Sequence, residues 1–263
     1  MQQQESQHIL ATEDLSIGYS SKKTIKIVAE KIQLQLKKGT FVSLLGKNGI
    51  GKSTLLRTLS NVQKPLQGNI YINQKNVKQF NSNQLATCIS LVLTERLPES
   101  QLSVFELVAL GRQPYTNWVD HLTTFDIEKI NTAMKLTEIT HLASQRYYEL
   151  SDGQFQRVLI ARALAQDTSL IILDEPTAHL DLHHTLQIFR VLKKLVTETS
   201  KTILISTHEV NLAIKFSDEI ALMNENSFYK DTSDKLIENN LFDSLFLDEM
   251  IHFDKNLRQF IIK

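Results

Sequence analysis

Residues 46–54 read Gly-Lys-Asn-Gly-Ile-Gly-Lys-Ser-Thr, and this segment limits the possible folds of the chain more than any other. It satisfies the pattern G-x-x-x-x-G-K-S/T, in which glycines let consecutive backbone amides point toward one phosphate group. The apolar residues 40–45 before it are typical of a buried strand, and residues 55–59 after it can continue as a helix. A strand, this loop and a helix in that order predict a binding site for a nucleoside triphosphate.

The side chains of the loop predict how the triphosphate is held. The ammonium group of Lys52 can reach the β- and γ-phosphates, and the hydroxyl of Ser53 can ligate Mg²⁺. The helix that starts here also directs the positive end of its dipole at the phosphates. We therefore expect the nucleotide to be bound by Gly46, Lys47, Asn48, Gly49, Ile50, Gly51, Lys52, Ser53 and Thr54.

Composition excludes several other classes of function. The formal net charge is zero, since 29 basic residues balance 29 acidic ones, and this leaves no basic excess for binding nucleic acid. Cys88 is the single cysteine, so an intramolecular disulfide and a cysteine zinc cluster are excluded. The N-terminus has no basic region followed by an apolar run, and no apolar stretch approaches the length of a membrane span. We expect a soluble, cytoplasmic protein.

Apolar segments of strand length alternate with longer segments whose apolar residues recur every three or four positions. This alternation predicts a parallel sheet covered by helices on both faces, which is the α/β class. We expect one domain over residues 8–263, with a helical subdomain inserted at about 95–165 and a flexible N-terminus over 1–7. The expected strands are 9–19, 24–36, 69–72, 169–173 and 202–206, with a helix over 181–199 and a helix plus a strand over 234–263.

Polar residues follow two of the apolar strands. Asp174 and Glu175 come directly after one strand, and His208 follows the end of the next. Asp174 is placed to hold the Mg²⁺ that Ser53 also contacts. Glu175 could polarise an attacking water, while His208 could contact the γ-phosphate and hold that water. We therefore expect Glu175 and His208 to be catalytic.

The segment Leu150-Ser-Asp-Gly-Gln154 resembles the signature motif of one family, the ATP-binding subunits of ABC transporters. The resemblance covers essentially the whole chain, with the motifs in the family's order. It implies an ABC cassette of the P-loop NTPase fold, with a mainly parallel sheet core, an antiparallel β subdomain and a helical subdomain. A second phosphate clamp, acting on the ATP of another copy, would then consist of Ser151, Asp152, Gly153 and Gln154.

The same resemblance implies a head-to-tail homodimer that holds two ATP molecules, with Mg²⁺, between its subunits. Tyr19 lies where an aromatic ring stacks on adenine in that family, and Asp181 ends a segment, Ala178-His-Leu-Asp181, that matches the loop crossing the dimer interface. His208 matches the family's switch histidine.

Two positions depart from the family pattern. Thr94 stands at the coupling position, where the family usually has a glutamine that contacts Mg²⁺ and the attacking water. Threonine is too short for that contact without a bridging water, so the coupling step is in question. Asp152 stands where the commonest signature motif has glycine, and its charge would be unfavourable beside phosphate unless the side chain points away.

Residues 104–115 resemble a segment of importers of iron-siderophore complexes, haem and cobalamin, which carry Gly-Arg-x-Pro-aromatic at this point. This implies an ATPase that drives uptake through integral membrane permease subunits, fed by a substrate-binding protein, at the cytoplasmic face of the cell (inner) membrane. Gly111 to Tyr115 and Trp118 would then lie near the docking surface, unless they only pack the helical subdomain. An exporter motor and a soluble ABC ATPase without a permease are the alternatives; one unbroken cassette argues against the soluble kind.

Three histidines, His179, His183 and His184, are close together at the start of a predicted helix. His179 and His183 are four residues apart, so a metal site is conceivable. Polar surface is the commoner reason for such residues beside an interface loop, and it is the interpretation that we prefer from the sequence.

Overall fold

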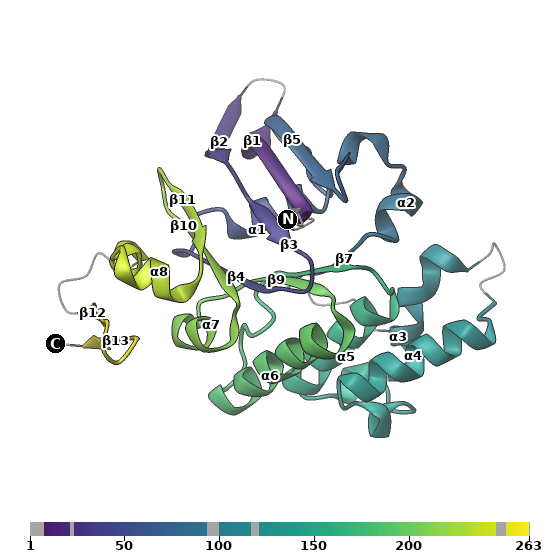
Figure 1. Cartoon of the computed structure of the whole chain (residues 1–263). Coiled ribbons are helices and arrows are strands. Elements are labelled where there is room, and N and C mark those ends of the chain that lie inside the picture. Colours follow the sequence, from purple (N-terminus) through teal and green to yellow (C-terminus); the bar gives the residue numbers. More distant parts are fainter. Residues whose placement is uncertain (1–7, 22–23, 94–99, 117–120, 246–250, 263) are drawn as a thin grey trace, which may run out of the picture.

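The computed structural model describes residues 8–21, 24–93, 100–116, 121–245 and 251–262, so Thr94 and Trp118 lie outside the described residues (Figure 1). At its centre is a six-stranded sheet in the order β11-β10-β4-β9-β8-β7. Every pairing from β10 to β7 is parallel, and only the edge strand β11 runs antiparallel to its neighbour. The strands are β4 (Phe41–Leu45), β7 (Ile89–Val92), β8 (Leu170–Leu173), β9 (Thr202–Ser206), β10 (Glu219–Met223) and β11 (Phe228–Asp231).

Both faces of this sheet are covered, because alternate side chains of each strand enter different cores. Phe41 of β4 packs with α6 (Leu182–Thr199) on one face, whereas Val42 packs with α1 (Lys52–Leu59) on the other. All residues of β4, β8, β9 and β10 are buried. Strands buried on both faces read as continuous apolar runs, which confirms the predicted α/β class.

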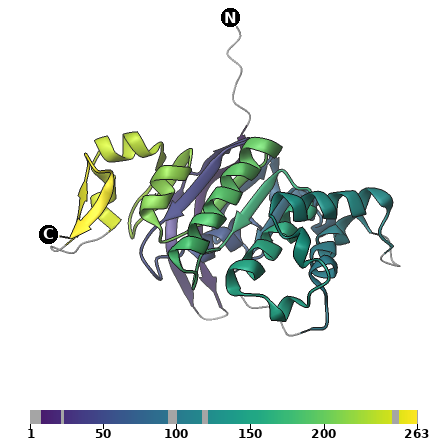
Figure 2. The same ribbon diagram turned by 90° about the horizontal axis from the view of Figure 1, so that it is seen from below.

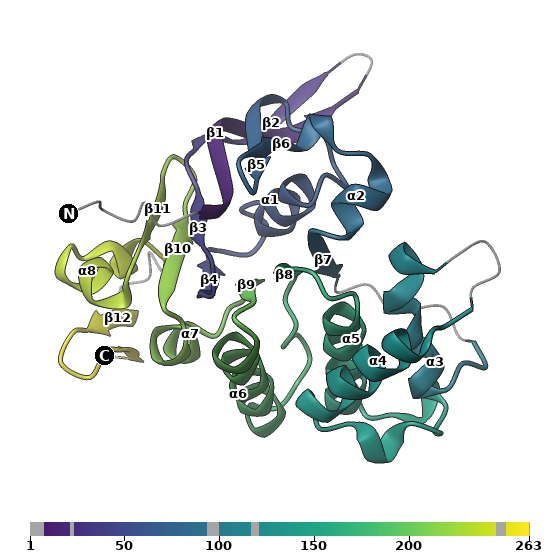
Figure 3. The same ribbon diagram turned by 45° about the vertical axis from the view of Figure 1, so that its right-hand side comes forward.

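A second, antiparallel sheet lies beyond α1, as Figure 3 shows. It has the order β2-β1-β5-β6, with β3 also paired to β1. Its strands are β1 (His8–Ser20), β2 (Ile25–Ile32), β3 (Gln35–Lys37), β5 (Gln67–Ile72) and β6 (Lys75–Asn76). The leucines of α1 share one core with both sheets, so this helix fills the space between them.

The single strand predicted over 24–36 was wrong, because the chain breaks there into β2 and β3. Residues 33–34 belong to neither strand, and Lys31, near the end of β2, has a left-handed φ of 53° where the register of β2 against β1 shifts. Thr12 holds both sides of the break, since its hydroxyl donates to the Ile32 carbonyl at 2.8 Å and accepts from the Leu34 amide at 2.8 Å.

Helices gather at one end of the molecule, on the side of β7 and β8 (Figure 3). Four helices in this part begin with a capping box, formed by Asn81 with Gln84, Ser103 with Glu106, Thr123 with Asp126, and Ser151 with Gln154. Their bounds are α3 (Val104–Ala109), α4 (Thr124–Leu136) and α5 (Asp152–Ala165), with α2 (Ser82–Ala86) nearby and short 3₁₀ turns at Val77–Gln79, Leu110–Tyr115, Thr140–Leu142 and Tyr147–Glu149.

The C-terminal part lies at the opposite end, beyond α7 (Val210–Phe216) (Figure 2). It contains α8 (Ser233–Glu238), a 3₁₀ turn over Leu241–Leu245, and an antiparallel hairpin of β12 (Ile251–Asp254) and β13 (Gln259–Ile262). The sequence predicted one strand in 234–263, whereas the structure has two, β12 and β13. The turn between them is fixed by Asp254, whose carboxylate accepts hydrogen bonds from the amides of Asn256 and Leu257.

The hairpin is attached through stacked aromatic rings. Phe253 of β12 stacks on Phe242 with ring centroids 4.9 Å apart, and Phe260 meets Phe253 edge-on at 5.1 Å.

Among the described residues, no helix combines the length and the apolar character that crossing a bilayer requires.

Candidate active site

The phosphate loop joins the end of β4 to the start of α1, at the carboxyl edge of the parallel sheet. Gly49 and Gly51 have φ of 75° and 114°, a region that favours glycine. A Cβ atom at Gly51 would lie 2.2 Å from Cγ1 of Val28, so no larger residue fits there. Gly51 also caps α1 without a side-chain hydrogen bond, which leaves the helix start open to an anion.

Lys52 is buried in the middle of this loop. Its ammonium group donates to the carbonyl oxygens of Gly46 at 3.0 Å and Lys47 at 3.2 Å. It also lies 3.2 Å from Nε2 of His208 and 3.6 Å from Oε1 of Glu175. Burial lowers the pKa of Lys52, and the Glu175 carboxylate acts in the opposite direction. The loop therefore holds a cation at its centre, aimed at the sheet edge where Glu175 and His208 meet.

Asp174 lies at the end of β8 and is almost completely buried. Its Oδ1 accepts hydrogen bonds from the hydroxyl of Ser53 at 3.0 Å and from that of Ser206 at 2.7 Å. Oδ2 is buried and has no hydrogen-bond partner in the described part of the chain. A carboxylate oxygen without a hydrogen-bond partner and a serine hydroxyl beside it are both oxygen ligands, which a hard divalent cation prefers. These residues therefore fit Mg²⁺.

Ser206 is a site residue that the sequence reasoning did not single out. Its hydroxyl donates to Asp174 and accepts a 2.9 Å hydrogen bond from the backbone amide of Glu175. It thereby holds the ends of β8 and β9 together. The available signal was a serine closing an apolar strand two residues before His208.

Glu175 and His208 form a pair above Asp174. Nε2 of His208 lies 2.8 Å from Oε1 of Glu175, and both side chains are partly accessible to solvent. Glu175 has φ of 46°, a conformation that turns its side chain out of the strand direction. A carboxylate in this position can accept a proton from water while the imidazole holds the carboxylate in place. The predicted catalytic residues are therefore adjacent in space, and their roles stay a prediction.

Tyr19 approaches the same loop from β1. Its hydroxyl lies 2.9 Å from Oγ1 of Thr54, and 54% of its surface is exposed. The ring is thus fixed at one end and open on a face, as stacking on a nucleobase requires.

The segment 151–154 starts α5, and its hydrogen bonds stay within that helix. The amide of Ser151 donates to Oε1 of Gln154 at 3.0 Å, and the amide of Gln154 donates to Oγ of Ser151 at 3.4 Å. Gly153 is buried, whereas Ser151 and Asp152 are exposed. The predicted second clamp therefore stands on the surface, where another molecule can reach it.

Asp181 is exposed and caps α6 by accepting the His184 amide at 2.8 Å. Of the predicted site residues, the structure gathers the phosphate loop, Tyr19, Asp174, Glu175 and His208. The segment 151–154 and Asp181 form a separate group at the starts of α5 and α6. The coupling position, Thr94, falls outside the described residues.

Only part of the segment 111–115 faces outward. Gly111 and Arg112 are buried, and a Cβ atom at Gly111 would lie 2.2 Å from the Arg162 carbonyl oxygen of α5. Arg112 donates to Asp126 at 2.8 Å and to the Ala165 carbonyl at 2.8 Å. Gly111 and Arg112 therefore pack the helices together, whereas Gln113 and Tyr115 are exposed, Tyr115 to 42%.

Comparison with known proteins agrees with this geometry. The ABC transporter family model matches residues 29–178. The achromobactin transport ATP-binding protein of Dickeya dadantii is 34% identical over 90% of this chain and 87% of its own length, and the iron(3+)-hydroxamate import ATP-binding protein of Bacillus subtilis is 36% identical over 84% and 81%.

Two solved structures, each 28% identical, are similar throughout. An inward-facing transporter of metal-chelate type matches with TM-score 0.78 over 97% of this chain and 95% of its own. A dimeric ATP-binding cassette in a post-hydrolysis state, bound to ADP and phosphate, matches with TM-score 0.73 over 85% and 98%. The chain belongs to the ATP-binding subunits of the ABC transporter family, and it is an ATPase of that family.

Proposed function

We propose that this chain is the ATP-hydrolysing motor of an ABC importer that takes up iron-siderophore complexes, haem or cobalamin. The observation that carries the ATPase part is the cluster of Lys52, Asp174, Glu175 and His208 around one phosphate loop. The substrate class is supported by relatives named for achromobactin and iron-hydroxamate transport and by the resemblance of residues 104–115.

Hydrolysis needs a metal, a positioned triphosphate and an activated water. Ser53 and Asp174 would hold Mg²⁺, which supplies positive charge to the phosphate oxygens when bound. Lys52 binds the β- and γ-phosphates, and the open start of α1 binds the remaining charge. Glu175 takes the proton of the attacking water, and His208 orients Glu175 and contacts the γ-phosphate.

Without nucleotide, Lys52 and Glu175 neutralise each other across 3.6 Å. When the triphosphate binds, its phosphate oxygens replace Glu175 as the partner of Lys52. The Glu175 carboxylate is then available to the attacking water. Lys52 thus pairs with Glu175 in the absence of nucleotide and binds the phosphates when ATP is present. Binding of ATP therefore frees Glu175 to act as the base.

Each site is completed by a second copy of the chain. Ser151 and the start of α5 are exposed and would clamp the ATP of the partner subunit, while Asp181 lies beside them along the interface. A similar cassette is a dimer in its post-hydrolysis state, which supports this arrangement. ATP binding then draws two cassettes together, and hydrolysis releases them.

We place the permease in a groove of about 410 Å³ between the end of α1, α2 and the end of α5. Phe80, Leu85 and Leu91 line it, and exposed Val62 stands at its rim. A groove that combines these apolar side chains with polar ones such as Asn61, Asn81 and Gln166 can accept a short amphipathic helix. The motor would then sit at the cytoplasmic face of the membrane, and a substrate-binding protein would deliver the substrate to the permease on the far side.

The groove has a direct test. Val62→Asp should abolish stimulation of the ATPase by the reconstituted permease and leave the basal rate of the isolated cassette unchanged. Leu257→Asp, an equally exposed site in the C-terminal hairpin, is the control. If Val62→Asp is stimulated as well as the wild type, the permease docks elsewhere.

Growth tests the function as a whole. Deleting the gene should impair growth when siderophore-bound iron, haem or cobalamin is the sole source of its nutrient. A plasmid copy of the wild type should restore growth, and Glu175→Gln, expressed at the same level, should not. Normal growth of the deletion strain on all three, with no second uptake system present, would refute the substrate class.

A further inference from the structure

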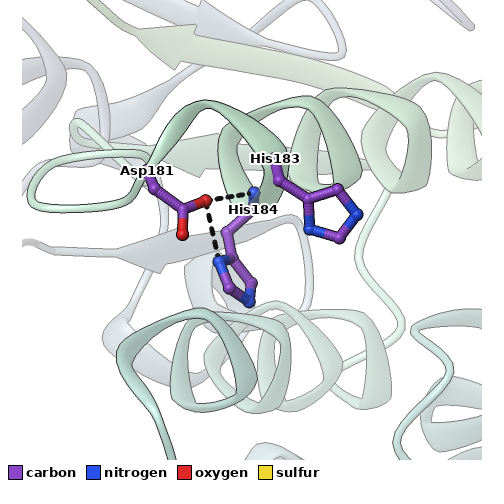
Figure 4. A group of neighbouring side chains, drawn as sticks. All are labelled: Asp181, His183 and His184. Carbon is purple, nitrogen blue, oxygen red and sulfur yellow. Dashed lines mark hydrogen bonds and ion pairs between the residues drawn. The ribbon is translucent and has the colours of Figure 1, made fainter.

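Asp181, His183 and His184 converge at the start of α6, as Figure 4 shows. One ligand atom from each, a carboxylate oxygen and two imidazole nitrogens, lie within 4.8 Å of one another. His179, which the sequence placed in this group, is not part of it; it lies two residues before the N-cap Asp181 and has a left-handed backbone (φ 67°). Asp181 takes its place.

The carboxylate of this group is held in position and in its charged form. Oδ1 of Asp181 lies 2.8 Å from the backbone nitrogen of His184 and 2.9 Å from Nδ1 of the same residue. The backbone hydrogen bond, followed by the bond to the ring, lowers the pKa of Asp181. An N-cap carboxylate is fixed by its own helix, so it does not have to be ordered when a ligand arrives.

The ring of His184 is held from the other side by α5. A Cβ atom at Gly153 would lie 2.6 Å from Cδ2 of His184, so the imidazole rests directly on the backbone of the segment 151–154. The His183 ring lies beside the His184 ring, with centroids 5.4 Å apart and planes at 80°. Nε2 of His183 lies 3.4 Å from the side-chain amide nitrogen of Gln187. His184 is therefore fixed, whereas His183 is exposed and can rotate when it gives up its contact with Gln187.

We propose that Asp181, His183 and His184 bind a divalent transition-metal ion of the zinc class. Two imidazoles and one carboxylate are the protein donor set of some catalytic zinc sites, and a fourth position stays open for water. Tetrahedral zinc at roughly 2.0–2.1 Å from each ligand places the ligand atoms about 3.3 Å apart, a contraction that rotation of exposed His183 can supply. Asp181 and His184 exchange the hydrogen bond that they share for two bonds to the metal.

This site differs from the Mg²⁺ position in donor chemistry and in place. Ser53 and Asp174 offer oxygen only, which suits Mg²⁺, whereas nitrogen donors favour zinc, nickel and copper. The metal would join Asp181 of the interface loop to His184 and, through its packing, to the start of α5. Both elements belong to the surface on which we place the second subunit.

Titration of the full chain with Zn²⁺ tests the proposal, in excess Mg²⁺ and without nucleotide, by calorimetry and by the absorption spectrum of Co²⁺ used in its place. The wild type should bind one ion. His183→Ala removes an exposed ligand without touching the core, and should weaken binding at least tenfold, about the smallest loss that even an outer partner of a metal ligand produces. His184→Asn should do the same, and the Co²⁺ spectrum should lose its tetrahedral band.

His179→Ala is the matched control, since it removes a neighbouring exposed histidine that lies outside the group. It should bind Zn²⁺ as the wild type does. The proposal is overturned if His183→Ala keeps wild-type affinity, if His179→Ala loses as much affinity as His183→Ala, or if the wild type shows no saturable site. Thermal unfolding of the metal-free variants checks that each is folded.

Discussion

Lys52 is a buried charge whose partners in this structure are all groups of its own site. In the proposed mechanism, Lys52 would exchange two carbonyl oxygens, Glu175 and His208 for phosphate oxygens, so its contribution to ATP affinity would be the difference between two sets of contacts. Burial of the ammonium group lowers the pKa of Lys52, so the resting site opposes its charged form. Binding of a multiply charged phosphate reverses that balance.

Lys52→Ala should therefore lose ATP affinity roughly 10- to 150-fold, the equivalent of about 1.5–3 kcal/mol for hydrogen bonds to a charged group. The folded state itself should lose little, because the substitution also removes a desolvated charge. Calorimetric titration with ATP and Mg²⁺ measures the first effect, and thermal unfolding the second. Lys64→Ala, an exposed lysine beyond α1, should leave ATP affinity unchanged. Equal affinity in the two variants would contradict the role of Lys52.

Asp152 puts a negative charge in the first turn of α5, where the macrodipole favours it in the free chain but where a phosphate would meet repulsion. Asp152→Asn should therefore strengthen ATP-induced association of two cassettes and raise the ATPase rate, with a gain that shrinks as salt is added. Light scattering and phosphate release measure these effects. Asp234→Asn, in the first turn of α8, is the control and should change neither. No gain for Asp152→Asn would mean that its side chain points away from the bound nucleotide.

At the scale of elements, Arg112 and Asp126 join three pieces of helical structure. Arg112 binds Asp126 at the start of α4 and the Ala165 carbonyl at the end of α5, and its guanidinium lies 4.1 Å from the ring centre of Tyr115. Hydrogen bonds from Thr123 lower the pKa of Asp126, and Arg112 acts in the same direction. A buried ion pair with its hydrogen bonds satisfied is costly to break by removing one partner.

Asp126→Ala should destabilise the chain by about 3–5 kcal/mol, since it leaves the Arg112 charge buried without a counter-charge. Because the pKa of Asp126 is depressed in the folded state, the stability it contributes is present above the unfolded value of about 3.9 and is lost as pH falls through the lower folded value. Thermal unfolding between neutral and acid pH measures both effects. Glu128→Ala, exposed on the same helix, should behave as the wild type. A difference that persists unchanged into strong acid would exclude the ionised pair as its source.

The elements that the sequence predicted are those whose pattern is local. Residues 169–173 and 202–206 read as apolar runs because the sheet is buried on both faces, and β8 and β9 lie there. What the pattern missed depends on contacts between distant residues. The break between β2 and β3 is held by Thr12, twenty residues away, and the inward turn of Arg112 depends on Asp126 and Ala165. Periodicity carries no signal for such partners.

The candidate site divides in the same way. The loop 46–54 and Asp174 could be recognised because a short motif sets their backbone geometry. Ser206 could not, because its partners Asp174 and Glu175 lie at the end of a neighbouring strand. Tertiary packing, and not sequence distance, decides those neighbours.

At the scale of the whole molecule, we propose that one chain carries two half-sites that serve different nucleotides. The phosphate loop lies at the edge of the parallel sheet, while the side chain of Ser151 is engaged with its own helix and exposed. Head-to-tail pairing of two chains would bring each loop opposite the other chain's Ser151. The number of intact sites in a mixed dimer then follows from which half is damaged in which subunit.

Lys52→Ala damages the loop half of a site, and Ser151→Arg the other half, so neither variant alone should turn over ATP. In a mixed dimer one site collects both defects and the other has none. An equal mixture should therefore recover about a quarter of the wild-type rate per cassette, since about half of the dimers are mixed and one of their two sites is intact. Phosphate release measures the rate, and differently tagged subunits report the mixed dimer by co-purification. Mixed dimers without recovery, or full turnover by a chain that light scattering shows to be monomeric, would rule out shared sites.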